Sequence, residues 1–375
     1  MYVIKVETYK SGKFAFSRMF SLRKINPLHI EAQILYETIK DLPILPQLAT
    51  SLEQELIQRS IHGTAAIEGN PLTEDRVSEI ITGADPVDGK ERAEQEILNL
   101  KTAYAFVQEL KDPVEHLELT EKFISDVHRL ITHGIDIELN NPGVYRNHKV
   151  QVGDRNHGGV YTPPKCLPDI NKLMTVFCEW INSEELVKLY PPIRAALTHY
   201  YLGLVHPFGD GNGRTARIIE AVMMRASGIK YVPIMLSNYY YRNMDEYFST
   251  FPKTIKNKEN DVTPFLRFIL KGFIASLREL KEKIIFYIRK FSLRDYYVYL
   301  KNEKLITRRQ HDLLVILLET QGTFSLHDLF TNMPFKVLYR NVSERTARRD
   351  LAKLSPTLLN NIERNKYELN WRALE

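Results

Sequence analysis

The feature that most constrains this 375-residue chain is a short glycine-rich segment between two long helical patterns. An apolar stripe predicts a first helix that begins near Pro192 and ends at His206. A second predicted helix begins near Asn212 and ends at Gly228. The intervening residues 206–213 read His-Pro-Phe-Gly-Asp-Gly-Asn-Gly, and a plain helix connection needs no such run of proline and glycine. The segment therefore indicates a backbone shaped for binding.

The start of the second helix has the properties of a phosphate site. The backbone N–H groups of Gly211, Asn212 and Gly213 can converge on an anion, and the N-terminus of the helix adds a partial positive charge. Arg214 and Arg217 are three residues apart in the first turn, so both guanidinium groups can contact further phosphate oxygens.

Two side chains next to this site can supply the remaining chemistry. Asp210 is a hard oxygen ligand suited to a Mg²⁺ ion that bridges nucleotide phosphates. His206 is the side chain of this segment whose pKa suits proton removal from an incoming hydroxyl. A base, a metal ligand, an anion site and two cations thus lie within residues 206–217.

The whole segment His206–Arg217 resembles the signature HPF-x-(D/E)-GNGR-x-x-R of the Fic family, with a match at every fixed position. The resemblance implies a helical Fic fold and a protein adenylyltransferase, or AMPylator, that uses ATP and Mg²⁺. It implies that His206 deprotonates a Ser, Thr or Tyr hydroxyl of a target, which attacks the α-phosphorus of ATP while pyrophosphate leaves.

The same resemblance assigns roles to the other residues of the motif. Asp210 would bind Mg²⁺, and residues 211–213 would hold the phosphates. Arg214 and Arg217 would reach the β- and γ-phosphates, and Phe208 would anchor the loop in the core. The alternative is a glycine-rich helix connection in which the histidine is incidental.

Residues 148–162 predict one β-hairpin in an otherwise helical domain. His148–Val152 and Gly159–Thr162 are short alternating runs, joined by the glycine-containing segment 153–158. The hairpin is similar to the flap of Fic proteins, so Val152 and Gly153 are expected beside the nucleotide. Its exposed edge could align an extended target segment by strand addition. A surface hairpin without a role is the alternative.

An aromatic segment, Leu236–Phe248, resembles the part of the family that lies beside the adenine. Tyr247 is the candidate for stacking on the base, and Phe248 stands where a second tyrosine is common, so that tyrosine's hydrogen bond would be absent. Aromatic residues at helical spacing also fit a plain hydrophobic core.

An inhibitory segment is indicated upstream, where Thr64–Asn70 resembles the family motif (S/T)-x-x-x-E-(G/N). Thr64 and Glu68 are four residues apart and share one helix face, and Gly69 can end the helix. We expect Glu68 to pair with Arg217 where the γ-phosphate of ATP should lie, which would turn the α-phosphorus away from attack. An ordinary helix end with a solvated glutamate is the alternative, and in related enzymes this glutamate also supports removal of AMP.

The C-terminal third carries the excess positive charge. Residues 251–375 contain 24 Lys and Arg against 14 Asp and Glu, or +10, while residues 1–250 contain 27 against 32, or −5. Helical patterns at 307–319, 325–332 and 343–354, followed by a strand at 367–371, resemble a winged helix-turn-helix. Arg345, Arg348 and Arg349 on its third helix could contact DNA phosphates. Protein contact or dimerisation is the alternative.

These patterns predict a mainly α protein: a Fic helical fold with a β-hairpin flap and a C-terminal winged helix-turn-helix domain. We expect three parts, a helical region with the inhibitory helix at 1–110, a catalytic core at 111–300 and the winged domain at 301–375. The two cysteines lack the neighbours of a disulfide framework or a zinc site. With no long apolar run, we expect a cytoplasmic protein that does not enter a membrane.

The functional hypothesis is an adenylyltransferase that modifies a target protein or itself, is inhibited by Glu68, and removes AMP as an additional activity. A DNA-binding transcriptional regulator with a nucleotide-sensing Fic core is the alternative. Transfer of phosphate or phosphocholine is a further alternative, although Asp210 and both arginines favour ATP in the ordinary orientation. A homodimer is also open.

Overall fold

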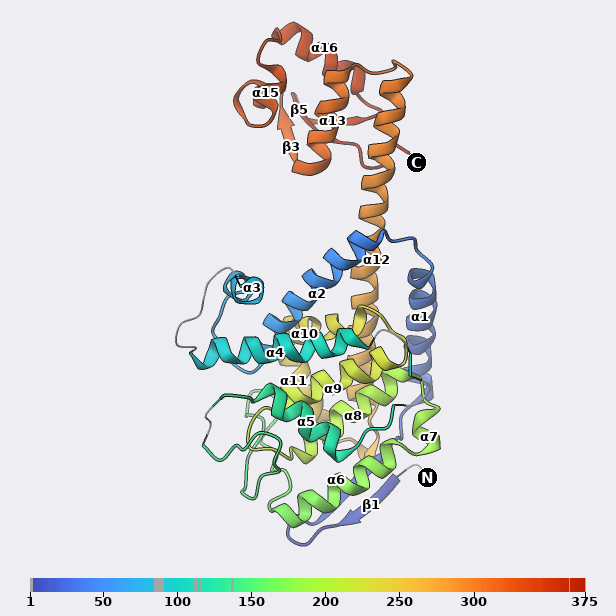
Figure 1. Cartoon of the computed structure of the whole chain (residues 1–375). Coiled ribbons are helices and arrows are strands. Elements are labelled where there is room, and N and C mark those ends of the chain that lie inside the picture. The colour runs from blue at the N-terminus through green and yellow to red at the C-terminus, as the bar shows by residue number, and fades with distance from the viewer. Residues whose placement is uncertain are drawn as a thin grey trace. The chain divides into compact units, whose positions relative to one another are not determined.

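The computed structural model describes residues 3–83, 91–110, 113–114, 117–135, 138–363 and 365–374. The chain forms two compact units, Met1–Leu280 and Lys281–Glu375. The described residues are mainly helical, which confirms the predicted class (Figure 1). The predicted loop at Gly83–Lys90 lies outside the described residues beyond Gly83, which ends a helix with φ +73°.

The first unit opens with a two-stranded antiparallel hairpin and continues with helices and one short 3₁₀-helix. Their bounds are β1 Val3–Glu7, β2 Lys13–Ser17, α1 Leu22–Lys40, α2 Pro46–Ile67, α3 Glu74–Thr82, α4 Arg92–Glu109, α5 Glu121–Ile131, α6 Leu167–Ile181, α7 Glu184–Val187, α8 Pro191–Val205, α9 Asn212–Ala226, α10 Val232–Arg242, α11 Met244–Ile255, η1 Lys258–Asn260 and α12 Thr263–Asn302, which continues into the second unit.

Helices α8 and α9 form the centre of the first unit, and almost every residue of both is buried. Helix α9 packs against α4, α5, α8 and α10, while α6 packs on α8 (Figure 1). Burial on all sides fits helices that are apolar around most of their circumference. The loop between α8 and α9 is therefore held at the middle of the helical unit.

The N-terminal hairpin was not predicted from the sequence. Its strands pair from Val3 with Ser17 to Glu7 with Lys13, and Gly12 with φ +78° closes the turn. The ring of Phe16 is buried against Trp180 and Tyr201, with ring centroids 5.6 and 5.1 Å away. This aromatic contact helps to hold the hairpin on the helical core. The alternating runs Val3–Glu7 and Lys13–Ser17 on either side of Gly12 could have predicted this hairpin.

The predicted flap hairpin at residues 148–162 is much smaller than expected. It consists of one isolated antiparallel pair, in which Val152 and Tyr161 exchange hydrogen bonds of 2.9 and 2.8 Å. Gly153, Gly158 and Gly159 have φ of +86°, +105° and +116°. Positive φ at Gly159 interrupts the extended backbone of the second arm, and the two predicted strands are reduced to this single pair.

The second unit combines helices with a three-stranded antiparallel sheet in the order β3-β5-β4. Its core residues include Leu293, Tyr297 and Leu300 of α12, so this unit begins inside α12 at Lys281 rather than at the boundary of 301 expected from the sequence. The three-part division itself stays a prediction. The remaining elements are α13 Arg308–Thr320, β3 Thr323–Ser325, α14 Asp328–Thr331, α15 Phe335–Tyr339, α16 Glu344–Leu354, β4 Leu359–Glu363 and β5 Lys366–Leu369. Across the described ranges, no helix combines the length and the apolar character that spanning a membrane requires.

Candidate functional site

The loop between α8 and α9 is shaped by its own side chains. His206 ends α8 in the left-handed conformation, with φ +48°. Phe208 is buried and stacks on His128, with ring centroids 3.7 Å apart and planes inclined by 2°. The Asn212 side chain accepts a hydrogen bond from the Phe208 N–H and donates one to its carbonyl, both at 2.9 Å. The asparagine therefore closes the loop on itself, and the anion site is formed by backbone.

Two residues outside the motif, His128 and Arg146, hold the loop by hydrogen bonds to its backbone carbonyls. The sequence analysis predicted neither of them. The Gly143 N–H donates to Nδ1 of His128 at 2.8 Å, so Nε2 carries the proton and donates to the carbonyl of Asp210 at 2.9 Å. Burial lowers the pKa of His128 to about 4, which keeps this ring neutral. Arg146 Nε donates to the His206 carbonyl at 2.8 Å.

A cavity of about 320 Å³ lies over the first turn of α9. It brings together seven of the residues singled out in the sequence, from α2, the flap, the motif loop, α9 and α11. These are Glu68, Val152, Gly153, His206, Gly213, Arg217 and Tyr247. We call it the main cavity.

The other predicted site residues do not line the main cavity. Thr64 is buried in α2, where its hydroxyl lies 3.1 Å from that of Tyr104, and Gly69 follows the helix with φ +85°. The motif residues that are also absent from its lining are Asp210, Gly211, Asn212 and Arg214. The wall also includes residues without a sequence motif, among them His199, Leu204, Phe251 and Ile255, together with Phe248 of the aromatic segment.

Glu68 occupies the anion site of the motif. Its Oε1 lies 2.6 Å from Nη2 of Arg217, which also donates to the carbonyl of Thr64 at 3.2 Å. A Cβ added at Gly213 would collide with the Glu68 carboxylate, so the carboxylate lies directly on the backbone of the first turn of α9. Burial alone would lower the pKa of Arg217. The adjacent charge of Glu68 outweighs burial and raises this pKa above its ordinary value. The ion pair therefore fills the position where an anionic ligand would bind.

Arg214 and Asp210 are also occupied. Arg214 is buried and pairs with Asp210 Oδ2 at 3.1 Å and with Glu96 Oε1 of α4 at 3.3 Å. Glu96 Oε2 in turn accepts from Nδ2 of Asn70 at 3.0 Å, and Asn70 is two residues beyond Glu68. Both arginines of the motif are thus paired with carboxylates of the N-terminal helices.

Tyr247 belongs to a buried polar chain at the far wall of the main cavity. Its hydroxyl lies 2.9 Å from Nε2 of His199, and Nδ1 of His199 lies 3.0 Å from Oε2 of Glu220. The Tyr247 ring stacks on Tyr240, with centroids 5.1 Å apart and planes inclined by 4°. Burial raises the pKa of Tyr247 to about 12. One face of the ring is therefore already covered, and the wall is rigid.

His206 can act as a base at neutral pH. Burial, together with the charge of Arg146, lowers the pKa of His206 to about 4. The imidazole is then neutral, and a neutral imidazole has one nitrogen free to accept a proton.

Among the described residues, no group of three or more His, Cys, Asp or Glu side chains could hold a metal ion without further ligands.

These features define a class of helical protein in which a histidine faces an anion-binding helix N-terminus that is occupied by a carboxylate of the same chain. A family model described as the Fic/DOC family matches residues 118–224. This part of the chain is therefore similar to the Fic/DOC family, in agreement with the resemblance inferred from His206–Arg217.

The named relatives are similar to part of the chain. The protein adenylyltransferase Fic of Drosophila erecta is 34% identical over 224 residues, which cover 58% of this chain and 40% of that protein. The protein adenylyltransferase Fic of Drosophila virilis is also 34% identical over 224 residues, covering 58% and 41%. The chain thus spans about 40% of the length of the curated relatives that it matches.

Two solved structures share the fold. A Fic family protein from Desulfovibrio desulfuricans G20 has a TM-score of 0.56 and 21% identity, over 92% of this chain and 96% of that chain. Fic-1 from C. elegans has a TM-score of 0.53 and 25% identity, over 70% of this chain and 72% of that chain.

Proposed function

We propose that this chain transfers AMP from ATP to a Ser, Thr or Tyr hydroxyl of a protein, and that Glu68 inhibits the transfer. The observation that carries the proposal is the main cavity, which His206, Gly213 and Arg217 line together. The names of the Drosophila relatives support the same reaction. The proposed target is a protein that supplies the hydroxyl, or this chain itself.

In the proposed reaction, His206 takes the proton of the target hydroxyl. The hydroxyl oxygen then forms a bond to the α-phosphorus, and the bond from that phosphorus to the pyrophosphate oxygen breaks. The backbone at residues 211–213 and the guanidinium of Arg217 would hold the phosphates, while Val152, Gly153 and Tyr247 would border the nucleoside. Positioning and charge stabilisation supply most of the rate in such a site.

Asp210 fits a Mg²⁺ ion that is held mainly by nucleotide phosphates. Its carboxylate is part-exposed and its Oδ2 is shared between Arg214 at 3.1 Å and Arg92 at 3.5 Å. Mg²⁺ is commonly bound by one or two carboxylates together with substrate phosphates and water, so a single aspartate is a sufficient protein ligand. The bound ion would neutralise charge on the phosphates.

The test is label transfer from α-³²P-ATP, with γ-³²P-ATP alongside, in a cell lysate. Wild type, Glu68→Gly and Glu68→Gly/His206→Ala are compared. Alpha label alone, strong in the single variant and absent from the double variant, is the expected result. Gamma label would indicate phosphate transfer instead, and no label in any lane would favour the regulator described below.

The pH dependence of transfer follows from the low pKa of His206. Because its folded pKa is lowered to about 4, the base is already deprotonated at higher pH, and its active form is lost only as the pH falls toward that value. We expect a flat rate from about pH 8 to about pH 5.5. Initial rates of Glu68→Gly with saturating Mg-ATP measure this. A midpoint near the ordinary histidine value of about 6.5 would contradict the assignment.

A DNA-binding regulator with a nucleotide-sensing core is the second candidate function. It is supported by helices α13 and α16 and the three-stranded sheet of the second unit, which are compatible with a winged helix-turn-helix. Helix α16 also presents exposed Arg345 and Arg349, and Arg348 pairs with Glu344 of the same helix at 2.6 Å. Protein contact by the same helix is the remaining alternative.

Retention on DNA at low salt tests this candidate. Arg348→Ala/Arg349→Ala should weaken retention of the full chain and reduce the salt dependence by about one counterion per lost phosphate contact. The matched control, Arg294→Ala/Lys301→Ala, removes the same charge from α12. No retention of wild type, or equal loss in both variants, would contradict a role of α16 in reading DNA.

The proposal has three further parts: the same site removes AMP, the chain forms a homodimer, and the protein is located in the cytoplasm. Removal of AMP is supported by the position of Glu68 in the main cavity, where a carboxylate can orient water. The dimer and the location rest on the sequence alone.

A further inference from the structure

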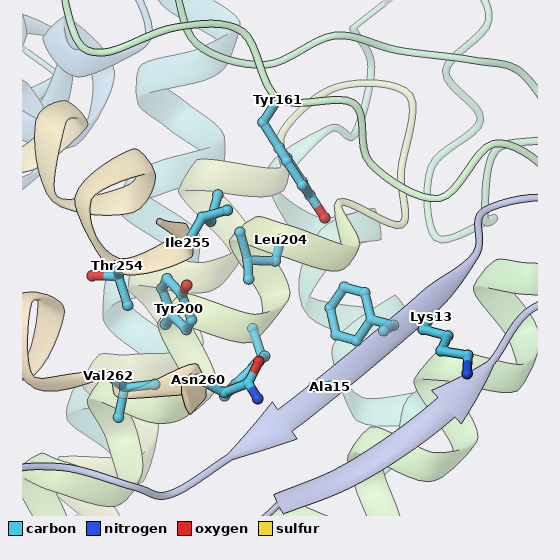
Figure 2. A pocket seen from close by; sticks show the side chains of 11 residues that line it. Lys13, Ala15, Tyr161, Tyr200, Leu204, Thr254, Ile255, Asn260 and Val262 are labelled. Carbon is cyan, nitrogen blue, oxygen red and sulfur yellow. The ribbon is translucent and has the colours of Figure 1, made fainter. Parts of the chain in front are cut away.

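A second, smaller cavity adjoins the main cavity. Its volume is about 170 Å³, and we call it the side cavity. Tyr161 of the flap, Leu204 of α8 and Ile255 of α11 line both cavities, so the two share a wall. Figure 2 shows these three side chains at the side cavity. A chain that enters one is therefore adjacent to the other. The remaining lining residues are Lys13, Phe14, Ala15, Tyr200, Tyr201, Thr254, Asn260 and Val262.

One border of the side cavity is the free edge of strand β2. The N–H of Thr8 donates a hydrogen bond to the carbonyl of Gly12, so these two residues form a hydrogen-bonded pair. Because such pairs alternate along an antiparallel ladder, Phe14 and Phe16 are the next residues of β2 whose backbone groups face β1. Ser17, at the opposite phase, instead exchanges hydrogen bonds with the Tyr201 hydroxyl, at 2.6 and 3.1 Å.

The alternation leaves Ala15 with its N–H and C=O directed away from β1. Ala15 is paired in register with Lys5, and it borders the side cavity (Figure 2). An exposed strand edge of this kind binds an extended peptide by adding a strand.

Two phenol hydroxyls of the side cavity can donate hydrogen bonds to a bound side chain. The hydroxyl end of Tyr161 points into it, and the Tyr200 ring lies beneath (Figure 2). Burial raises the pKa of Tyr161 to about 12, and it raises the pKa of Tyr200 above its ordinary value, with the neighbouring Tyr161 adding to the effect. Both phenols are thus protonated donors, and no carboxylate occurs among the described residues that line the cavity.

Lys13 adds positive charge at the rim. Its ammonium lies 3.2 Å from Glu7, and both side chains are 76% exposed. An exposed pair of this kind contributes little to stability and is easily exchanged for another carboxylate. Donors inside and a cation at the rim are complementary to an acidic side chain.

We propose that the free edge of β2 and the side cavity bind an extended segment of the substrate protein, with one Asp or Glu side chain in the side cavity and the modified hydroxyl a few residues away at His206. This inference rests on the proposed AMP transfer. Because Tyr161, Leu204 and Ile255 line both cavities, we expect the acidic residue of the peptide within about four positions of the Ser, Thr or Tyr that is modified.

A positional peptide library tests the acidic side chain. Short peptides carry a central Ser, Thr or Tyr, one scanned residue within about four positions on either side, and random residues elsewhere. Glu68→Gly protein labels them with α-³²P-ATP. At one position, Asp or Glu should give about tenfold more label than Lys or Leu. Tyr161→Phe/Tyr200→Phe in the same background keeps the ring shapes and should remove this preference.

A backbone variant tests the strand edge with a matched control. Ala15→Pro removes the N–H that faces the side cavity and leaves the bonds between β1 and β2 intact, because proline is tolerated at an outward-facing edge position. Lys5→Pro removes the N–H of its cross-strand partner on the opposite edge. Only Ala15→Pro should raise KM for the preferred peptide, while thermal melting checks the fold of both variants.

Each result decides between the two proposals. Peptide label without a positional preference, or a preference for Leu, would overturn the acidic docking site and leave AMP transfer standing. Equal effects of both proline variants would overturn binding at the β2 edge. Absence of label from every peptide and from lysate proteins would overturn the proposed transfer itself, and the docking site with it.

Discussion

Replacing Glu68 with glycine should raise the rate of AMP transfer by on the order of a hundredfold. In the structure the Glu68 carboxylate lies against Gly213 and 2.6 Å from Arg217, at the N-terminus of α9. A γ-phosphate cannot occupy the same position, so we expect ATP to bind with its α-phosphorus away from the attack line. Removing the side chain frees both the backbone amides and the guanidinium.

The measurement is the initial rate of label transfer from α-³²P-ATP by wild type, Glu68→Gly and Glu68→Gln. The glutamine variant keeps the size of the side chain but removes its charge, so an intermediate rate would separate the ion pair from the steric block. ATP affinity, measured by calorimetry, should change much less than the rate. Equal rates for wild type and Glu68→Gly would contradict inhibition by Glu68.

Loss of His206 in the released enzyme should lower transfer by about a hundredfold to ten-thousandfold, the usual contribution of a general base. His206 lines the main cavity and is neutral at physiological pH, so it is ready to accept the hydroxyl proton. The test compares Glu68→Gly with Glu68→Gly/His206→Ala in the same assay.

The conformation of His206 calls for a second variant. Its φ of +48° is in the left-handed region, where alanine is disfavoured and asparagine is tolerated. Glu68→Gly/His206→Asn should therefore fold like the parent, as judged by thermal melting, and still lack transfer. Retained activity in a folded asparagine variant would show that another group removes the proton.

The sequence predicted the parts of the site that are contiguous. Residues 206–217 carry their chemistry within one loop and one helix turn, so spacing alone placed a base beside an anion site. Glu68 was found through a motif, since no local rule joins residue 68 to residue 217. The structure places the two side chains in contact because α2 packs on α9 and α10.

What the sequence did not predict depends on contacts between distant segments. His128 stacks on Phe208 across 80 positions of chain, and Glu96 reaches Arg214 from α4. The β1–β2 hairpin is held on the core by the buried ring of Phe16 and by Asp169 of α6, which accepts hydrogen bonds from the N–H groups of Tyr9 and Lys10. The flap was overestimated because glycines were treated as a connection, whereas the positive φ of Gly159 interrupts the second arm.

The link through Asn70 makes the two arginines of the motif interdependent. The Asn70 side chain ties the turn after Glu68 to Glu96, and Glu96 holds Arg214, while Glu68 holds Arg217. A movement of the end of α2 would therefore break the contact of Glu68 with Arg217 and remove the hydrogen bond of Asn70 to Glu96, the carboxylate that pairs with Arg214, so the surroundings of both guanidinium groups change together.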